Sequence, residues 1–210
     1  MMMQGSKYIH FADPVVAQIC ATTWGDGIGL TYEQAANVSN IQGYFYNKGI
    51  SSFNEFRFFV GVSAIKQSSL RNNPLKSIVF PPSLKSTELG TLWGVTQLIS
   101  VTMNNGLETL GGHDFRECTS LPFIEFPGSV TSIGDACCYG CSSLETVVMR
   151  PTTPPALGSD SVFGYCHANL KIYVPYSADH SILNAYKSAT YWSNLSGKLY
   201  ELDENGNIPT

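Results

Sequence analysis

The chain has 210 residues, 43% of them hydrophobic, which is enough to bury a stable core in one domain or two small ones. Only 13% of its residues are charged, the net charge is −4, and its lysines and arginines are scattered singly, so it has no basic stripe for nucleic acid. No apolar run approaches the ~20 residues that a membrane-spanning helix needs.

Two short helices are predicted near the N-terminus. Asp13 followed by Pro14 is a helix N-cap with proline at the first helical position, and apolar residues follow through Cys20. Thr31 and Gln34 have the spacing of a capping box, which predicts the start of a second helix. We therefore expect a helix, a tight loop and a second helix.

The loop between these helices invites comparison with a calcium-binding EF-hand loop. Placing Gly27 at the loop's glycine position puts Asp26 and Glu33 at two ligand positions. Thr22 and Trp24 then occupy two other positions that require carboxylates. Two carboxylates are too few, so we predict an EF-hand-like outline without its ion, and bound calcium is the alternative.

A strand and a further helix are predicted next. Residues 41–46 are rich in strand-forming aromatic residues, and Ser52 and Glu55 have capping-box spacing, before a helix that Gly61 can stop. Three phenylalanines of this helix share one face: Phe53, Phe56 and Phe59. We interpret this stripe as core at the end of the repeats, and a ligand platform is the alternative.

The middle of the chain repeats itself. Leading leucines recur every 23 residues, at Leu75, Leu98, Leu121 and Leu144. Each begins a frame of the L-x-x-I-x-F type, in which the second and fourth copies have Val and Met at the last two apolar positions. In a fifth, stretched copy Ile172 follows Val147 by 25 residues. A fixed interval of roughly 20 to 29 residues in such a frame is typical of leucine-rich repeats. Stacked coils, each adding a strand to a parallel sheet, are therefore predicted.

A different sequence follows Pro175. Residues 181–189 predict an amphipathic helix, and a last strand is expected near 198–202. Residues 203–210 are expected to form a loose polar tail. The whole chain is thus an α/β solenoid of about five coils. We predict a helical, degenerate EF-hand-like N-terminal cap with a half repeat over 1–65, the leucine-rich repeats over 66–176, and a C-terminal helix-plus-strand cap with the tail over 177–210.

The repeat frame resembles the BspA-like leucine-rich repeats of bacterial surface proteins. This resemblance rests on the Cys-Ser-Ser-Leu phrase at 141–144, the proline after the strand, and Val-Thr-Ser-Ile-Gly at 130–134. Flanking segments are similar to those of short members from gut anaerobic bacteria and their phages: Ile9 to Pro14, Trp24 to Ala36, Ile172 to Pro175 and Ala185 to Thr190. The resemblance implies the architecture and does not name a ligand.

Cysteines cluster at Cys137, Cys138 and Cys141, a spacing that raises the question of zinc or redox chemistry. The repeat explains them differently, because Cys118, Cys141 and Cys166 share one repeated position. No second C-x-x-C or histidine pair completes four ligands. We predict buried free thiols and neither metal nor cofactor. A disulfide between neighbouring coils and a metal site are the alternatives.

No catalytic constellation stands out. The four histidines lie in separate segments without i, i+4 pairing: His10, His113, His167 and His180. No nucleophile elbow accompanies them, and Glu125 and Glu145, one repeat apart, do not make a glycosidase pair. We therefore predict that the chain is not an enzyme.

The strand surface is the remaining candidate site. With alternate residues packed inward, ten side chains are expected on the outer face: Ser77, Val79, Ser100, Thr102, Phe123, Glu125, Thr146, Val148, Lys171 and Tyr173. Hydroxyls, two aromatic rings and few charges suit a protein or glycan partner. The alternative is a solvated face without a ligand.

These observations favour a non-enzymatic recognition or adhesion module, most simply part of a phage virion, associated with the tail or fibres, in host attachment. The first residues lack an apolar core behind a basic end, so we expect cytoplasmic synthesis without a secretory signal. The alternatives are a bacterial cell-surface adhesin, which predicts export, and a structural decoration or scaffold protein of an assembly. In a virion, other virion proteins are further expected partners. We expect no nucleic-acid partner and no membrane insertion, and the sequence does not define the oligomeric state.

Overall fold

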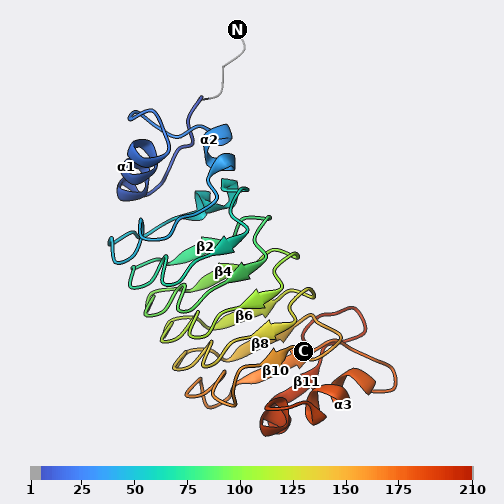
Figure 1. The fold of residues 1–210 in the computed structure, drawn as a ribbon. Helices are drawn as coiled ribbons and strands as arrows, with labels where there is room; N and C mark the ends of the chain where they lie inside the picture. Colours follow the sequence, from blue (N-terminus) through green and yellow to red (C-terminus); the bar gives the residue numbers. More distant parts are fainter. Residues whose placement is uncertain (1–5, 210) are drawn as a thin grey trace.

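The structure is a computed structural model that describes residues 6–209. It shows a stack of similar coils between two caps that contain helices (Figure 1). The helices are α1 Pro14–Thr23, α2 Tyr32–Asn37, η1 Asn54–Phe58, α3 Ser181–Ser188 and η2 Trp192–Lys198. The strands are β1 Ala64–Ile65, β2 Ser77–Val79, β3 Ser86–Thr87, β4 Ser100–Thr102, β5 Thr109–Leu110, β6 Phe123–Phe126, β7 Ser132–Ile133, β8 Thr146–Met149, β9 Ala156–Leu157, β10 Lys171–Val174 and β11 Leu199–Glu201. None of the helices in this described part has the length and hydrophobicity to span a bilayer.

From β1 to β10, successive strands join different sheets. The two-residue strands β1, β3, β5, β7 and β9 form one parallel sheet, in that order. The longer strands form the sheets β2-β4 and β6-β8-β10-β11, also parallel, which we together call the outer sheet. Ser77 lies opposite Ser100, and Phe123 lies opposite Thr146, so neighbouring strands are one repeat apart. The predicted solenoid is confirmed.

The core consists of columns of equivalent side chains. Leu75, Leu98, Leu121 and Leu144 are all fully buried. One coil is too thin to bury such a residue, and stacked neighbours supply the missing contacts. Burying a leucine side chain contributes about 1.5 to 3 kcal/mol relative to leaving it exposed, so a constant interval of leucines stabilises the stack at every step.

The turns also repeat. One residue in each turn has a left-handed backbone, with φ between 51° and 75°: Asn47, Asn72, Gly94, Glu117, Gly140 and Tyr165. The backbone N–H of one turn donates to a carbonyl of the next, as in Asn47 to Arg71 (3.0 Å), Asn72 to Trp93 (3.1 Å) and Glu117 to Tyr139 (2.8 Å). This ladder of turns begins at Asn47. The division of the chain at residues 65 and 176 stays a prediction.

The predicted strand at 41–46 is wrong. These residues form turns, with Gly43 at φ 84° and Asn47 at φ 51°. Phe45 is fully buried, two residues before the left-handed Asn47, as Leu70 and Leu92 precede Asn72 and Gly94. Aromatic residues that look like a strand therefore belong to the turn of an additional coil.

The helix predicted after Ser52 is a short 3-10 helix, η1, and its capping box is absent. Phe53 is the N-cap, without a side-chain capping bond, and Glu55 Oε1 instead accepts a hydrogen bond from the Ala12 N–H at 3.4 Å. Phe53, Phe56 and Phe59 are fully buried and contact one another, with ring centroids 5.1 to 5.7 Å apart. The core interpretation of this stripe is confirmed.

The two N-terminal helices are confirmed with their caps. Asp13 Oδ1 accepts from the Val15 and Val16 N–H groups at 2.9 and 3.3 Å, and the Thr31–Gln34 capping box is complete. The other Asp13 oxygen accepts from the Ser51 N–H at 2.7 Å, which ties α1 to the start of the coils.

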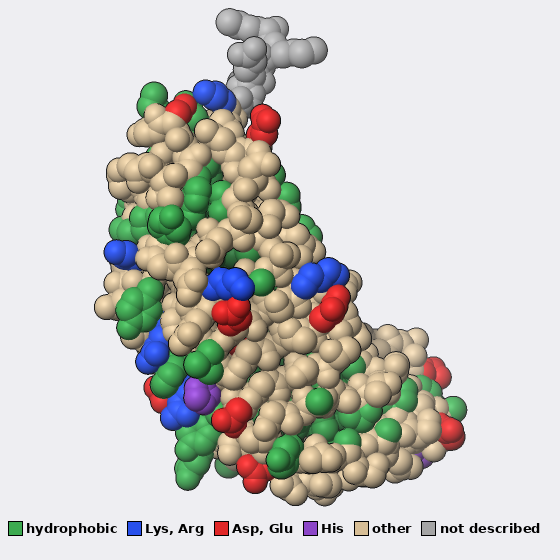
Figure 2. All heavy atoms as spheres, in the orientation of Figure 1, with side chains coloured by type: hydrophobic (Ala, Val, Ile, Leu, Met, Phe, Trp, Pro, Cys, Tyr) green, Lys and Arg blue, Asp and Glu red, His purple; other side chains and the backbone are tan. Residues whose placement is uncertain are grey.

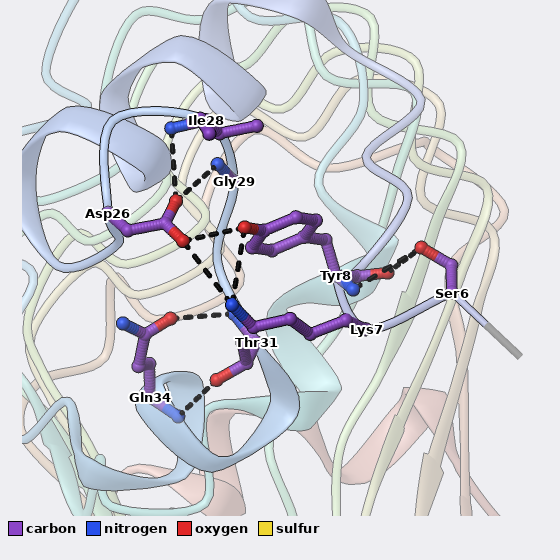
Figure 3. A network of polar contacts seen from close by, with 8 residues as sticks. All are labelled: Ser6, Lys7, Tyr8, Asp26, Ile28, Gly29, Thr31 and Gln34. Atoms are coloured by element: carbon purple, nitrogen blue, oxygen red, sulfur yellow. Dashed lines mark hydrogen bonds and ion pairs between the residues drawn. The ribbon is translucent and has the colours of Figure 1, made fainter.

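The Asp26 loop is closed by protein donors (Figure 3). The Asp26 carboxylate accepts from the Tyr8 hydroxyl at 2.6 Å and from the Ile28 and Gly29 N–H groups at 3.1 and 3.2 Å, and Lys7 Nζ lies 3.5 Å away. The Tyr8 hydrogen bond is the largest cause that lowers the pKa of Asp26, to about 2. The Asp26 carboxylate therefore holds the loop to the N-terminal segment, whereas the corresponding carboxylate of an EF-hand binds calcium.

The C-terminal cap is confirmed as a helix and a strand. Tyr186 of α3 and Trp192 are fully buried and donate to the carbonyls of Pro151 and Pro155 at 2.9 and 2.7 Å. Strand β11 pairs in parallel with β10. The prediction of a loose tail is wrong for residues 203–207, because the Asp203 N–H donates to the Asn207 carbonyl at 2.8 Å and closes a compact turn.

Candidate binding surface

The outer sheet is interrupted between β4 and β6. The Ile99 N–H donates to the Lys76 carbonyl of the preceding coil at 2.8 Å, and the Glu145 N–H donates to the Pro122 carbonyl at 3.0 Å. The equivalent residue in the coil between them is Pro122, which has no N–H. Within residues 6–209, no strand ladder joins β4 to β6. We call this interruption the seam.

A pocket of about 290 Å³ lies on the seam, lined by Val101, Thr102, Met103, Asn105, Phe123, Glu125 and Pro127. A second pocket of about 370 Å³ shares Thr102 and Met103 and is mostly apolar. Its wall on the cap side includes Phe58, whose ring lies 4.5 Å beneath the Arg57 guanidinium and edge-on to Tyr32 at 4.9 Å. The N-terminal half of the outer sheet is therefore hollowed and partly aromatic.

The predicted surface residues fall into three groups by exposure. The exposed residues are Ser100, Thr102, Phe123 and Lys171. The half-buried ones are Ser77, Val79, Glu125 and Thr146. The buried ones are Val148 and Tyr173, at 1% and 8% exposure. The seam brings together Thr102, Phe123 and Glu125, and Val79 lines the second pocket. Their role in binding stays a prediction.

Val148 and Tyr173 are not accessible, which corrects the expectation that they lie on a free face. They form a small cluster with Leu202, separate from the main core, and the Tyr200 ring lies 5.8 Å from that of Tyr173. Leu202, the residue after β11, and the Tyr200 ring therefore pack over Val148 and Tyr173. Val148 and Tyr173 are thus closed to a partner, whereas Lys171 on the same sheet stays exposed.

Arg150 joins the outer sheet to the C-terminal turn. Its guanidinium forms two hydrogen bonds with the Glu125 carboxylate, at 2.9 and 3.3 Å, and donates to the Gly206 carbonyl at 2.7 Å. Planar bidentate pairing of this kind fixes geometry as well as charge. Glu125 is thus neutralised at the edge of the seam pocket.

Arg150→Ala is expected to loosen the turn at 203–207. Hydrogen bonds from a charged donor contribute about 1.5 to 3 kcal/mol, so amide hydrogen exchange in this turn should become about tenfold faster or more. Exchange measured by mass spectrometry tests this, with Lys187→Ala, an exposed residue of α3, as the control. Unchanged exchange at 203–207 would show that Arg150 does not hold the turn.

Several residues that line the two pockets were not predicted from the sequence. Phe58 comes directly before the buried Phe59 and lines the second pocket, and Met103 directly follows β4 and lines both pockets. Pro122, directly before β6, was the available signal for the seam, because proline lacks the N–H that would donate to the preceding coil. Recognising it would have directed attention to Phe123 and its neighbours.

Three of the cysteines form a column of thiols at one repeated position. Each of these three donates to a carbonyl of the preceding coil: Cys118 to Leu92 at 3.4 Å, Cys141 to Phe115 at 3.0 Å and Cys166 to Cys138 at 3.3 Å. All six cysteines are free and five are buried, so the prediction of buried free thiols is confirmed for all but Cys166, which is half-buried. Burial is the largest cause that raises the pKa of Cys118 and, to about 12, that of Cys166. In the described residues no group of histidine, cysteine and carboxylate side chains has the geometry to hold a metal ion.

These features define a class of protein: a leucine-rich repeat solenoid with one hollowed sheet face. The model of the BspA type leucine rich repeat region matches residues 37–180 in six copies. The chain belongs to this family. No curated protein matches it.

Two solved structures share the fold. The T. pallidum leucine rich repeat protein aligns with a TM-score of 0.52 and 24% identity, over 68% of this chain and 63% of that one. A leucine rich cell surface protein from Faecalibacterium prausnitzii aligns with a TM-score of 0.51 and 27% identity, over 60% of this chain and 32% of that one. The chain thus spans less than two thirds of the length of each of these two proteins.

Proposed function

We propose that the chain is a non-enzymatic recognition module that binds a protein or glycan partner at the seam. The supporting observation is the exposed Phe123 ring, 41% accessible, at the rim of the seam pocket. Ile99, 56% accessible, belongs to the same coil as β4. Large apolar side chains beside hydroxyl and amide groups are the usual centre of a recognition surface.

Phe123→Ala tests this function. An exposed aromatic anchor in an interface typically accounts for about 2 kcal/mol or more, so binding should weaken about 30-fold. We suggest an array of bacterial surface polysaccharides, mucin glycopeptides and matrix proteins, probed with the labelled chain. Tyr176→Ala, which removes an equally exposed aromatic ring near the C-terminal cap, is the matched control. Binding that Phe123→Ala leaves intact would contradict a site at the seam.

As the place of action we propose a phage particle, with the chain associated with the tail or fibres in host attachment. The support is the resemblance of the flanking segments to short phage and prophage members, together with a face suited to a surface ligand. Mass spectrometry of purified virions should detect the chain in stoichiometric amounts. Finding it only in the soluble fraction of lysed host cells would refute this location.

The second candidate is a bacterial cell-surface adhesin. The alignment with the Faecalibacterium prausnitzii cell surface protein, at 27% identity, favours it. Labelling of intact bacteria with a membrane-impermeant reagent should then modify the chain. A purely structural decoration or scaffold protein is distinguished from both, because Phe123→Ala would then leave its assembly and function unchanged.

A further inference from the structure

A second surface runs along the turns. The residues before the first five left-handed turn residues are Tyr46, Arg71, Trp93, Arg116 and Tyr139, so aromatic and arginine side chains alternate over these five coils, and Gly164 ends the series at the sixth. We call this set the turn column. Hydrophobic and positively charged side chains gather along the edge formed by the turns, at the left of Figure 2. No residue of the turn column lines the seam pocket.

Cation–π contacts connect the middle of the turn column. The Arg71 guanidinium lies 3.7 Å from the centroid of the Trp93 ring. Arg116 lies 5.2 Å from Trp93 and 4.6 Å from Tyr139. Such stacking holds a guanidinium in a fixed plane, so that its hydrogen-bond donors are already oriented for a planar acceptor.

The two arginines differ in how their charges are balanced. Arg116 Nε donates to Glu117 Oε1 at 3.2 Å. Over residues 6–209, Arg71 has neither an ion pair nor a side-chain hydrogen bond, and its buried Nε has no partner. Buried polar groups nearly always have a partner, and a guanidinium favours a bidentate anion. The Arg71 guanidinium is therefore a cation whose charge no acceptor in residues 6–209 balances.

A pocket of about 330 Å³ adjoins Arg71. Gln42, Tyr46, Gln67 and Ser68 share its lining, and these offer amide, phenol and hydroxyl groups. The Gln67 N–H donates to Glu88 Oε2, but that carboxylate is paired with Lys66 Nζ at 2.8 Å and is neutralised. The pocket thus combines one uncompensated cation with several neutral hydrogen-bonding groups and an aromatic ring.

We propose that this pocket binds a carboxylate-bearing sugar, a hexuronic acid unit of an acidic polysaccharide. One carboxylate matches the single free guanidinium, and the amide, phenol and hydroxyl groups match the sugar hydroxyls. A polyphosphate chain would need several cations in a row, whereas the chain has a net charge of −4 and a lone unpaired arginine here. The ring of Tyr46 provides an apolar wall for the sugar's carbon face.

Isothermal titration calorimetry of the full chain with an oligogalacturonate and with its fully methyl-esterified form tests this proposal. The two probes have the same sugar units and differ in the carboxylate charge. At low ionic strength the acid form should bind at least tenfold more tightly than the ester. Arg71→Gln should remove that difference, and Arg71→Lys, which keeps the charge without the planar fork, should retain only part of it.

Lys85→Gln is the matched control, because it removes one positive charge from a side chain that is 56% exposed and paired with Glu108. This variant should bind both probes as the wild type does. Should Arg71→Gln fail to fold, as judged by circular dichroism, the exposed Gln67→Ala replaces it and should weaken binding of the acid form about threefold or more. Three results would overturn the proposal. They are equal affinity for the acid and the ester, no detectable binding of the acid form, and an equal loss of affinity for the acid form in Arg71→Gln and Lys85→Gln.

Phe123→Ala separates this site from the function proposed at the seam. That variant should bind the oligogalacturonate normally, because Phe123 does not line the Arg71 pocket. If the chain does not bind the oligogalacturonate, the proposal for the Arg71 pocket is wrong. The function proposed at the seam still holds if another ligand binds the chain and Phe123→Ala weakens that binding. The two sites thus stand or fall separately.

Discussion

Leu121→Ala is expected to lower the free energy of unfolding by about 3 to 5 kcal/mol. Leu121 is fully buried in the column that also contains Leu98 and Leu144, so truncation leaves a cavity between two neighbouring coils. The neighbours are held by backbone hydrogen bonds from coil to coil, which limits their collapse into the space. Against a typical total stability of about 5 to 15 kcal/mol, this loss is large.

Urea unfolding followed by far-ultraviolet circular dichroism measures the effect. Ile99→Ala is the control, because the same kind of truncation at a side chain that is 56% exposed should change the stability by less than about 1 kcal/mol. If Leu121→Ala were as stable as Ile99→Ala, the leucine column would not be the main support of the stack.

The solenoid could be predicted because its cause is local and repeated. Leu75, Leu98, Leu121 and Leu144 each need the next coil for burial, so their constant interval determines both the stacking direction and the strand register. The helix starts at Asp13 and Thr31 were predictable for a similar reason, since a cap acts within three residues of its own position.

The errors arise where tertiary position overrides local preference. Residues 41–46 have the composition of a strand, yet Phe45 takes the buried place of a turn and Gly43 and Asn47 adopt left-handed backbone. Aligning Asn47 with Asn72 in the repeat would have revealed this turn. Glu55 was assigned to a capping box, but it contacts Ala12, which is distant in sequence.

The candidate surface was predictable only in part. Alternation along a strand placed Thr102 and Phe123 correctly on the exposed side, because it depends on neighbouring residues alone. The same alternation predicts that Tyr173 is exposed, but Leu202 covers this residue. The position of Leu202 depends on how the chain returns after α3, which is not a local property of the strand. The turn column was not predicted from the sequence, because its residues occupy one repeated position in the coil but differ in chemical type.

Asp114 is the residue whose replacement should most change the pH dependence of stability. It is 1% exposed, and its carboxylate accepts hydrogen bonds from the Thr87 hydroxyl and from the Thr91 and Gly111 N–H groups, the latter two at 3.0 and 2.8 Å. Thr87 and Thr91 belong to the preceding coil, so Asp114 links two coils. Asp114→Ala leaves these donors without their carboxylate acceptor and is expected to cost about 2 to 6 kcal/mol.

Burial raises the pKa of Asp114 to about 7, more than these hydrogen bonds lower it. In the unfolded chain the group ionises near its ordinary value of 3.8. Between these two values the folded state holds a proton that the unfolded state has released, so the free energy of unfolding falls as the pH rises from about 4 to about 7. A difference of about three pH units corresponds to about 4 kcal/mol. This stabilisation is complete below the unfolded pKa and is lost as the pH passes through the folded one.

Asp114→Asn isolates this contribution, because asparagine keeps the size and one acceptor oxygen but does not titrate. The stability of the wild type relative to Asp114→Asn should increase steadily as the pH is lowered from 7.5 to 4.5, as measured by urea unfolding at each pH. The nearby Cys118 and Cys137 thiols do not interfere, since burial, the largest cause, raises the pKa of each above its ordinary value. Taking the difference between the two proteins also removes the effect of Asp13 and Asp26, whose pKa values are lowered and whose stabilisation declines in acid. A difference that stays constant over this range would mean that Asp114 is already ionised in the folded protein, held by its three donors in spite of burial.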